Sequence, residues 1–343
     1  MFKWYDESGE FTDVVISSRV RLARNLKKYP FSIRLSQEGA KALVEEVSGK
    51  LKNTKSEDGT LLACSLDSMD DIERTAMVER HILSPMIAEK KQTAGLLMSE
   101  NEAICVLINE EDHLRIQGMA GGMNIQKAFE RANRIDDMAE KTMEFAYDEK
   151  YGYLTSCPTN VGTGMRASYM MFLPALGAAG KINRLADEVG KYGAALRGMY
   201  GEGTEGTANI YQISNQKTLG SSEEDIIENL NNIALQVILQ ERKRREYVLM
   251  NNFEVIEDQI YRSYGVLKYT RQIGAKDAMT LLAQIKLGFD TGILKSDEPV
   301  NIFRMMMDIQ PSNLQCRLGK NTGSMKRDKA RAAYLNQNLP KLL

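Results

Sequence analysis

Residues 103–117 carry the pattern that most constrains what this chain can fold into. The apolar run A-I-C-V-L-I at 103–108 is followed by N-E-E-D-H-L-R at 109–115, after which apolar and polar residues alternate. This order predicts a strand, a polar turn and a returning strand. Three consecutive carboxylates followed by His113 and Arg115 are unusual in a plain connector, although a charged turn is often simply solvated. The turn becomes a candidate site once other segments supply matching charges.

The overall charge excludes several classes of function. The 343 residues carry 45 basic and 46 acidic side chains, so no bulk charge attracts the chain to nucleic acid or to a membrane. No apolar run approaches the roughly 18 residues that a membrane-spanning helix needs, and the N-terminus is too acidic for a signal peptide. These features predict a cytoplasmic protein without a direct nucleic-acid or membrane partner.

The cysteines and histidines argue against a disulfide framework and against a protein-held metal. Four widely spaced cysteines without a C-x-x-C pair are typical of reduced cytosolic thiols; they are Cys64, Cys105, Cys157 and Cys316. Only two histidines are present. The sequence therefore predicts no metal site built from protein ligands.

The segment 14–24, V-V-I-S-S-R-V-R-L-A-R, predicts a strand with basic residues on one face. Side chains two apart on a strand point the same way, so Arg19 and Arg21 lie side by side. Two adjacent guanidinium groups repel each other unless an anion lies between them, and phosphate oxygens match the planar guanidinium. A solvent-facing basic edge strand is the alternative.

Two further segments have the composition of a binding site. Residues 155–168, T-S-C-P-T-N-V-G-T-G-M-R-A-S, are small and polar and end near Arg166, where a helix is predicted to begin. Cys157 differs in setting from a core cysteine, although a small apolar filler is its simplest role. Residues 197–206, R-G-M-Y-G-E-G-T-E-G, contain a formal G-x-G-x-x-G. A helical stretch before it and a strand-like run at 208–213 exclude the dinucleotide fingerprint and favour a loop that closes over a ligand.

The remaining pattern is helical and divides the chain in two. Amphipathic spacing and capping residues predict helices at 36–51, 71–83, 123–147, 226–250, 253–264, 275–287, 300–307 and 326–335. The first part mixes strands and helices, whereas the second is helical throughout. We therefore predict an α+β fold with a catalytic domain at 1–245 and a small all-α domain at 246–343.

Five ordered motifs resemble the phosphagen (guanidino) kinases. They are S-S-R-V-R at Ser17–Arg21, N-E-E-D-H-L-R at Asn109–Arg115, C-P-T-N at Cys157–Asn160, R-A-S at Arg166–Ser168 and R-G-x-x-G-E at Arg197–Glu202. Five motifs in this order are far more specific than any one of them. The resemblance spans about residues 14–245 and implies an antiparallel sheet flanked by helices, with ATP and Mg²⁺ as cofactors.

The C-terminal part resembles one branch of that family, the bacterial protein-arginine kinases. Only 16 residues precede Ser17, and a helical region follows the motifs, whereas relatives acting on free creatine or arginine carry a helical domain before that strand. The R-D-K-A-R-A segment matches the branch's R-D-x-x-R-A phosphoarginine-binding motif; its residues are Arg327, Asp328, Arg331 and Ala332. The resemblance implies transfer of the γ-phosphoryl group of ATP to arginine side chains of proteins.

The chemistry of the acceptor explains which residues such an enzyme needs. A guanidinium has a pKa above about 12 and no free lone pair at neutral pH, so it must be aligned and lose a proton. A carboxylate on each side can hold the planar group and accept that proton. Glu111 is the predicted base and Glu202 the predicted clamp, as the resemblance also implies. A Cys157 thiolate is expected to assist polarisation of the guanidinium.

The resemblance also implies a set of nucleotide contacts. Arg19, Arg21, Arg115, Arg166 and Arg197 are expected on the ATP phosphates and His81 against the adenine. The full predicted ATP site is Ser17, Ser18, Arg19, Val20, Arg21, His81, Arg115, Arg166, Ala167, Ser168, Tyr169, Met170, Arg197, Gly198, Met199, Tyr200, Gly201 and Glu202. Mg²⁺ is expected to be held mainly by the nucleotide.

Partners and alternatives follow from the same resemblance. It implies a homodimer formed through the helical domain, a zinc-binding activator protein, stress-repressor substrates and delivery of marked proteins to a Clp chaperone-protease. A kinase of a free guanidino metabolite is one alternative, but it needs a pocket lid that the pattern does not supply. A phosphoarginine-binding adaptor is another, but an adaptor need not keep Glu111, Cys157 and Glu202.

Overall fold

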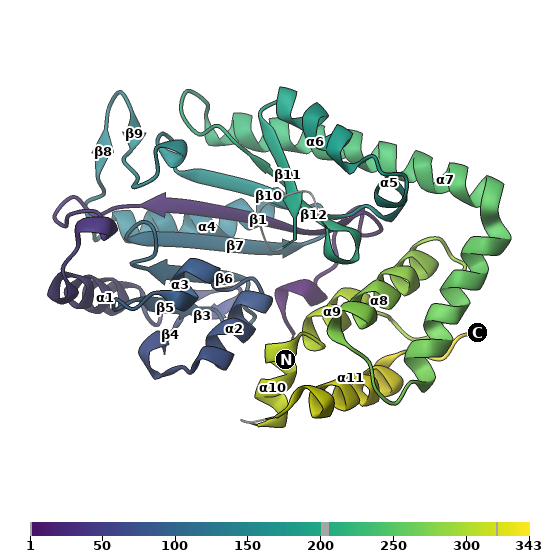
Figure 1. The fold of residues 1–343 in the computed structure, drawn as a ribbon. Helices are drawn as coiled ribbons and strands as arrows, with labels where there is room; N and C mark the ends of the chain where they lie inside the picture. Colours follow the sequence, from purple (N-terminus) through teal and green to yellow (C-terminus); the bar gives the residue numbers. More distant parts are fainter. Residues whose placement is uncertain (1, 200–205, 320–321) are drawn as a thin grey trace.

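A computed structural model describes residues 2–199, 206–319 and 322–343 and contains one large antiparallel sheet (Figure 1). The strand order is β11-β12-β10-β1-β7-β6-β5-β4, and every neighbouring pair is antiparallel. These strands are β1 Val15–Arg24, β4 Leu62–Ser65, β5 Gly95–Met98, β6 Ile104–Ile108, β7 Leu114–Gly121, β10 Met165–Phe172, β11 Ala194–Gly198 and β12 Ile210–Asn215. Two small hairpins pair β2 Lys55–Ser56 with β3 Gly59–Thr60 and β8 Tyr147–Asp148 with β9 Gly152–Tyr153. The predicted α+β class is confirmed.

Helices flank the sheet and form the C-terminal lobe. They are α1 Gln37–Leu51, α2 Asp71–Glu79, α3 Pro85–Glu89, α4 Ile125–Glu140, α5 Pro174–Ala178, α6 Ile182–Lys191, α7 Glu223–Tyr269, α8 Ala275–Asp290, α9 Ile302–Asp308, α10 Pro311–Leu318 and α11 Ser324–Asn338. Short 3-10 turns lie at Trp4–Asp6, Ser32–Arg34, Leu66–Ser68, Pro158–Asn160 and Thr207–Asn209. Within the described ranges, a helix with the length and hydropathy of a membrane span is absent.

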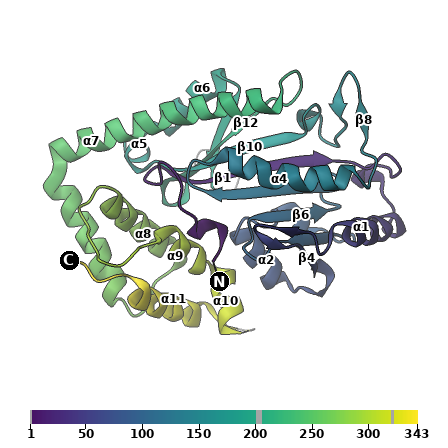
Figure 2. The ribbon, with the colours of Figure 1, turned by 180° about the vertical axis from the view of Figure 1, so that it is seen from behind.

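Strand β1 lies in the middle of the sheet, between β10 and β7. Its alternate residues Val20 and Leu22 are fully buried in the core on the side covered by α4 and α7 (Figure 2). Gly118 on β7 lets α4 pack closely, because a Cβ there would lie 2.1 Å from the main-chain oxygen of Ala128. The basic residues of β1 are therefore not on a solvent-facing edge strand, and that alternative is wrong.

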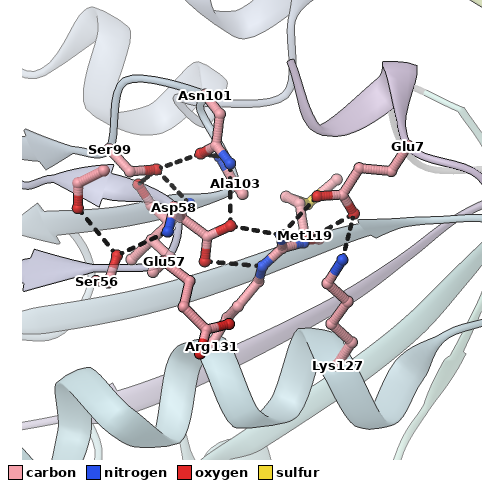
Figure 3. Close-up of polar contacts among 12 residues, drawn as sticks. Glu7, Ser56, Glu57, Asp58, Ser99, Asn101, Ala103, Met119, Lys127 and Arg131 are labelled. Carbon is pink, nitrogen blue, oxygen red and sulfur yellow. Dashed lines mark hydrogen bonds and ion pairs between the residues drawn. The ribbon is translucent and has the colours of Figure 1, made fainter. Parts of the chain in front are cut away.

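A buried ion cluster fastens the N-terminal segment to the helix side of the sheet (Figure 3). Arg131 on α4 donates to Glu7 Oε1 and to Asp58 Oδ1, both at 2.5 Å, and to the main-chain oxygen of Met119. Glu7 also pairs with Lys127 at 3.3 Å. Burial lowers the pKa of Arg131, but its hydrogen bonds to Glu7 and Asp58 outweigh that effect and raise it. This arginine is fully compensated by carboxylates.

Helix α7 links the sheet to the helical lobe. It begins at a capping box in which Ser222 and Asp225 exchange side-chain and main-chain hydrogen bonds, and it runs to Tyr269 with a local break at Asn252. Its first half packs on the sheet, and its second half packs with α8 and α11 (Figure 1). The predicted division between residues 245 and 246 falls inside this helix, and it stays a prediction.

The lobe also contacts the sheet region directly. Trp4 is almost fully buried, with its ring centroid 6.1 Å from that of Phe303 on α9. The carboxylate of Glu79, at the end of α2, accepts hydrogen bonds from the main-chain nitrogens of Ser312 (2.9 Å) and Asn313 (2.8 Å) on α10. These contacts tie the helical lobe to the segment that precedes His81.

Helix α2 is shorter than the predicted 71–83. It ends at Glu79, and His81 follows with a φ of 62°, in the left-handed region where a non-glycine residue is uncommon. Pro85 begins α3, with Ser84 as its N-cap, instead of ending α2. Proline fits the first position of a helix because its missing N–H has no helical partner there. His81 thus lies on a turn between two helices.

Three other predicted boundaries are wrong. Arg166 lies inside strand β10 and not at the start of a helix, and the glycine-rich segment 197–206 follows strand β11 and not a helix. Strand β10 contains alanine, methionine and arginine, and strand β11 contains alanine, leucine and arginine. Pairing with β1 or β12 overrides the helix propensity of these residues. Helix α4 ends at Glu140, not at 147. In the described residues after the glycines, a short 3-10 turn at Thr207–Asn209 leads into strand β12 and not into an α-helix, so the dinucleotide fingerprint remains excluded.

Candidate active site

The sheet register gathers the predicted arginines on one face. Arg21 on β1 stands directly opposite Arg166 on β10, and on the other side it faces Gln117, two residues along β7 from Arg115. Directly opposed residues of antiparallel strands project from the same face, and like charges in that position repel. Arg19 is two residues from Arg21 along β1, so its side chain projects from the same face. The predicted side-by-side placement of Arg19 and Arg21 is confirmed.

These arginines line a cavity of about 210 Å³ on the face of the sheet opposite α4. Its walls are Arg19, Arg21, Val78, His81, Leu83, Ser84, Pro85, Arg115, Arg166, Arg197, Gly198, Met199, Gln212 and Ser214. Five arginines in this space leave the cavity strongly electropositive. The cavity therefore favours an anionic ligand.

The arginines have few partners of their own. Arg19 donates to Gln212 Oε1 at 3.0 Å, and Arg166 donates to Ser214 Oγ at 3.1 Å, but both acceptors are neutral. Among the residues that the structure describes, Arg115 is the one of these with a carboxylate partner, Glu110 Oε1 at 2.5 Å. The Nε atoms of Arg21, Arg115 and Arg166 are buried without a hydrogen-bond acceptor among the described residues. Buried donors without acceptors are rare in folded proteins, and an anion would supply the missing acceptors.

The electrostatics agree with that geometry. Burial, together with Arg115 and Arg166, lowers the pKa of Arg19 to about 9. The pKa of Arg21 is lowered further by burial and by its arginine neighbours. Arg131, paired with two carboxylates, shows the opposite shift. The cavity thus holds positive charge that the described residues leave uncompensated, and the phosphates of a nucleoside triphosphate fit it.

The acidic turn 109–113 is anchored except for one residue. Asn109 is buried and donates to the main-chain oxygen of Thr93. Glu110 pairs with Arg115 and accepts from Ser84. Asp112 and His113 are both buried. The turn is therefore a rigid support and not a solvated tip.

Two of these anchors connect the turn to other segments. Asp112 Oδ1 accepts from Asn25 Nδ2 and from the main-chain nitrogen of Ser156, both at 2.6 Å. The ring of His113 accepts at Nδ1 from the main chain of Leu26, and its Nε2 donates to the main-chain oxygen of Pro30. Burial lowers the pKa of His113, so the ring is neutral. His113 is a structural residue.

Glu111 is the exposed member of the turn. Its pKa is raised by partial burial and by the neighbouring charges of Asp112 and Glu110, against the opposing effect of Arg115 and Arg21. A raised pKa makes a carboxylate a better proton acceptor near neutral pH. Glu111 is thus free to meet a second molecule at the edge of the arginine cavity.

Cys157 lies beside the same edge. The hydrogen bond from Ser156 to Asp112 holds its loop against the acidic turn, and its Sγ lies 3.0 Å from Thr159 Oγ1. Charges on Cys157 and Glu111 both act to raise the pKa of Arg166, although burial, Arg197 and Arg115 lower it overall. The structure therefore brings Cys157, Glu111 and Arg166 together.

His81 forms part of the opposite wall. It is buried, and its main-chain oxygen accepts from Gln117 Nε2 at 3.0 Å. Burial and the charge of Arg19 lower the pKa of His81 to about 3, so the ring is neutral. A neutral imidazole is compatible with the predicted contact to an adenine.

Some predicted nucleotide residues do not reach the cavity. Val20, Ala167 and Tyr169 point to the other face of the sheet and are buried in its core. Ser18 bridges the main chain of Gly122 and Asn124. Other side chains outside the cavity wall are those of Ser17, Ser168 and Met170, all buried. Alternation in a strand explains the positions of Ser18, Val20, Ala167 and Tyr169, because a contiguous motif exposes only every second side chain. Ser17, Ser168 and Met170 are on the same face as Arg19 and Arg166 but lie outside the cavity wall.

The predicted residues Tyr200, Gly201 and Glu202 lie outside the described residues. The strand that leads to them is described: Arg197, Gly198 and Met199 all line the cavity. Glu202 therefore follows closely on the cavity wall in sequence, and its proposed role as a clamp stays a prediction.

The predicted phosphoarginine-binding residues lie on α11, in the helical lobe. Arg331 is 1% exposed and donates to the main-chain oxygens of Ile309 (3.0 Å) and Ile273 (2.9 Å) and to Asp328 at 2.5 Å. Arg327 is half-buried and donates to the main-chain oxygen of Thr322 at 2.8 Å. Ala332 is buried. Arg331 thus holds the lobe together, whereas Arg327 is partly accessible, and the binding of phosphoarginine by these residues stays a prediction.

The neutral hydrogen-bond partners of the arginines were not predicted from the sequence. Gln212 and Ser214 on β12 orient Arg19 and Arg166, and Ser84 supports Glu110. Their spacing of two on a predicted strand was visible, but no motif includes them. Only the register between strands, which long-range pairing sets, brings them to the cavity.

Comparisons with known proteins agree with this site. A family model described as ATP:guanido phosphotransferase, C-terminal catalytic domain, matches residues 42–244. A second, described as Protein-arginine kinase McsB C-terminal domain, matches residues 253–342. The two matches together cover the helical lobe and every strand of the large sheet except β1.

Curated relatives are similar over nearly the whole chain. A protein-arginine kinase of Halalkalibacterium halodurans is 42% identical over 98% of this chain and 94% of its own length. The corresponding proteins of Desulforamulus reducens (40%, covering 99% and 96%) and Caldanaerobacter subterraneus (41%, covering 96% and 98%) are similarly related. These identities extend over both lobes.

Solved structures with the same fold include a duplicated taurocyamine kinase from Schistosoma mansoni with bound transition state analog components. It is 29% identical with a TM-score of 0.62, and the match covers 71% of this chain but only about a third, 34%, of that one. A lombricine kinase shares the fold at a TM-score of 0.59 and 24% identity, with 69% and 68% covered. Motifs, models and relatives agree with the family expected from the sequence. The chain therefore belongs to the protein-arginine kinase branch of the ATP:guanido phosphotransferase family.

Proposed function

We propose that this protein transfers the γ-phosphoryl group of ATP to arginine side chains of polypeptides. The observation that carries the proposal is the cavity in which Arg21 and Arg166 face each other, with buried Nε donors that have no acceptor among the described residues. The exposed carboxylate of Glu111 is close enough to act electrostatically on Arg166. A polyanion fits the cavity, and a guanidinium fits the carboxylate. Relatives named protein-arginine kinase, about 40% identical over the whole chain, support a polypeptide as the acceptor.

The arginines bind and neutralise the nucleotide. In phosphoryl transfer, negative charge spreads over the equatorial phosphate oxygens, so catalysis is mostly positioning and electrostatic stabilisation. Arg21, Arg115 and Arg166 present buried Nε donors to that charge. ATP supplies the phosphoryl group, and Mg²⁺ held by its phosphates further neutralises it. The neutral ring of His81 offers a surface for the base.

Glu111 prepares the acceptor. Its exposed carboxylate accepts hydrogen bonds from two N–H groups of the substrate guanidinium and aligns the attacking nitrogen. It takes the proton of that nitrogen as the nitrogen bonds to the γ-phosphorus and the bond from this phosphorus to the oxygen of the leaving ADP breaks. Glu202 is proposed to hold the guanidinium from the opposite side. The anchored turn restricts Glu111 to one position, which lowers the entropy lost on alignment.

The proposed activity is tested with ATP and two acceptors, free arginine and an unfolded polypeptide that contains arginine. Phosphoarginine on the polypeptide, identified as acid-labile phosphate and by mass spectrometry at neutral pH, is the expected result. Transfer only to free arginine would establish a metabolite kinase. Binding of phosphoarginine without any transfer would establish an adaptor. Glu57→Gln, a surface variant with 89% of the side chain exposed, controls for nonspecific effects.

Replacing Cys157 by serine tests its proposed role. If a thiolate polarises the guanidinium, Cys157→Ser lowers kcat by about 10-fold or more, since a hydroxyl is not ionised at neutral pH. Stability changes little, because the side chain is only half-buried and the two residues are similar in size. Single-turnover rates and the Tm are measured on the same preparations. An unchanged rate with a lowered Tm would assign Cys157 to packing alone.

We also propose that phosphoarginine binds near Arg327 and regulates the kinase. Arg327→Ala is expected to remove any change in initial rate caused by free phosphoarginine while leaving the Tm nearly unchanged. Arg331→Ala is expected to lower stability by about 2–4 kcal/mol, because buried carbonyl groups lose their donor. Rates with increasing phosphoarginine and thermal melts separate the two roles. An identical phosphoarginine response in wild type and Arg327→Ala would refute the proposed site.

The helical lobe offers a surface for the proposed homodimer. Phe253, Tyr261, Val266 and Tyr269 on the second half of α7 are each at least 46% exposed. Exposed apolar side chains on one element favour association. Sedimentation equilibrium should therefore give twice the mass of one chain. We further propose that the protein has three kinds of partner: an activator protein, stress-repressor substrates and a Clp protease that degrades the marked proteins. A pull-down with purified components tests each of these interactions.

A further inference from the structure

A groove lies between α6 and the first half of α7, two helices that lie at the top of the view in Figure 1. Two cavities of about 320 Å³ and 450 Å³ share Leu185, Glu188 and Gln240 and so form one continuous depression. Its floor is apolar and buried, with Val189 and Val237 among its residues. Neither the arginine cavity nor the phosphoarginine motif contributes to it.

One wall of the groove is a row of amides on α7. Asn229, Asn232, Gln236 and Gln240 recur at helical spacing and are all exposed. Among the last three, each amide residue is four positions from the next, which is about 6 Å along the helix axis at a rise of about 1.5 Å per residue. An extended polypeptide repeats every two residues, at about 6.6 Å. Each amide has two N–H donors and a carbonyl acceptor, which match the N–H and C=O groups of such a chain. Asn229 uses one donor on the main-chain oxygen of Tyr192, and Gln240 hydrogen-bonds to Glu188.

The far end of the same wall is basic. Lys243 and Arg244 follow the amides, with the guanidinium of Arg244 4.9 Å from the centroid of the Tyr247 ring. Arg244 Nε is buried without an acceptor among the described residues. The carboxylate in this groove, Glu188, already pairs with Arg184 at 2.9 Å. Positive charge is therefore available to an incoming acidic group.

From these observations we infer that the groove between α6 and α7 docks an extended segment of a substrate polypeptide, with acidic side chains at the Lys243–Arg244 end. The α7 residues from Asn229 to Tyr247 span about 27 Å, which matches about eight residues of extended chain. Main-chain recognition by amides does not depend on sequence, and this suits an enzyme that acts on many proteins. The inference rests on the proposed function only in taking the docked polypeptide to be a substrate.

The distribution of charge favours a polypeptide over a nucleic acid. A nucleic acid carries charge at every nucleotide and needs cations along its whole path. Here the amide wall separates the cations, with Lys191 at one end and Lys181, Lys243 and Arg244 at the other, while Arg184 pairs with Glu188. A single-stranded oligonucleotide of equal length therefore serves as the competing probe.

The binding test uses a fluorescein-labelled peptide of about 12 residues, with aspartates at one end and serine, glycine and asparagine elsewhere. It contains no arginine, so binding is measured whether or not the protein phosphorylates arginine. Fluorescence anisotropy of wild type should rise with protein concentration. Lys243→Glu with Arg244→Glu should raise the Kd at least about 10-fold, since attraction becomes repulsion.

A matched variant distinguishes the effect of the groove residues on peptide binding from the effect of net charge. Lys141→Glu with Lys276→Glu makes the same change in net charge at exposed positions on α4's C-cap and on α8, and it should bind the peptide like wild type. Asn232→Ala with Gln236→Ala should raise the Kd several-fold for the acidic peptide and equally for a serine-substituted one. Equal Kd values for wild type and the Lys243/Arg244 variant, or tighter binding of the oligonucleotide, would overturn the inference.

The kinase assay then connects the groove to turnover. With an arginine-containing version of the acidic peptide joined to a flexible linker, the Lys243/Arg244 variant should raise the KM for peptide and leave the KM for ATP unchanged. A merely structural role of these residues would instead lower the Tm and affect both constants. Peptide binding with no transfer in wild type would support the groove and count against the proposed activity.

Discussion

Glu111→Gln is expected to abolish phosphoryl transfer while leaving ATP affinity nearly intact. A glutamine keeps the shape of the side chain but cannot accept the proton of the attacking guanidinium, and loss of a general base slows reactions by about 10²–10⁴-fold. Glu111 is the exposed member of an otherwise anchored turn, so its replacement leaves no buried partner unpaired. Single-turnover phosphorylation and calorimetric titration with ATP measure the two effects separately.

Two controls give this prediction its specificity. Glu110→Gln changes the neighbouring carboxylate, which pairs with Arg115 and Ser84, so it should weaken ATP binding more than it slows transfer. Glu57→Gln, on a distant hairpin, should change neither. The raised pKa of Glu111 also implies that the rate climbs with pH through that value, and this acid limb should vanish in Glu111→Gln. Near-normal turnover in Glu111→Gln would disprove its role as the base.

Those features of the site that depend on neighbouring residues in the sequence could be predicted from the sequence. Period-two alternation correctly placed Arg19 and Arg21 on one face, and the apolar runs around 109–113 correctly predicted a hairpin. These features need only neighbouring residues. The same rule could have shown that Val20 and Tyr169 face the core, since a contiguous strand motif exposes alternate side chains.

The rest depends on contacts between distant segments. Nothing near Arg166 in the sequence indicates that it stands opposite Arg21, because strand order is fixed by burial of the whole sheet. The burial of Arg331 was hidden for the same reason: its acceptors are carbonyl groups of Ile273 and Ile309, which lie in other elements. The helix at Arg166 was predicted from propensity, and sheet pairing outweighed that propensity.

Arg21→Gln is expected to stabilise the nucleotide-free protein and to weaken ATP binding strongly. Arg21 opposes Arg166 in the sheet, and burial and the neighbouring arginines lower its pKa. Removing one charge relieves a repulsion of about 1 kcal/mol between opposed like charges, or roughly 2 °C in Tm. The same change deletes charge-assisted hydrogen bonds to phosphate, each worth about 1.5–3 kcal/mol, so the Kd for ATP should rise at least about 10-fold.

The pH dependence of the wild type gives an independent check on the same repulsion. The folded-state pKa of Arg19, about 9, lies below its ordinary value of 12.5, so above about pH 9 the unfolded chain binds more protons than the folded one and the free energy of unfolding rises with pH. ATP should flatten that rise, because phosphate oxygens favour the charged arginine. Thermal melts with and without ATP measure both effects. A Tm that falls in Arg21→Gln without nucleotide would show that the uncompensated charge in this cavity does not destabilise the fold.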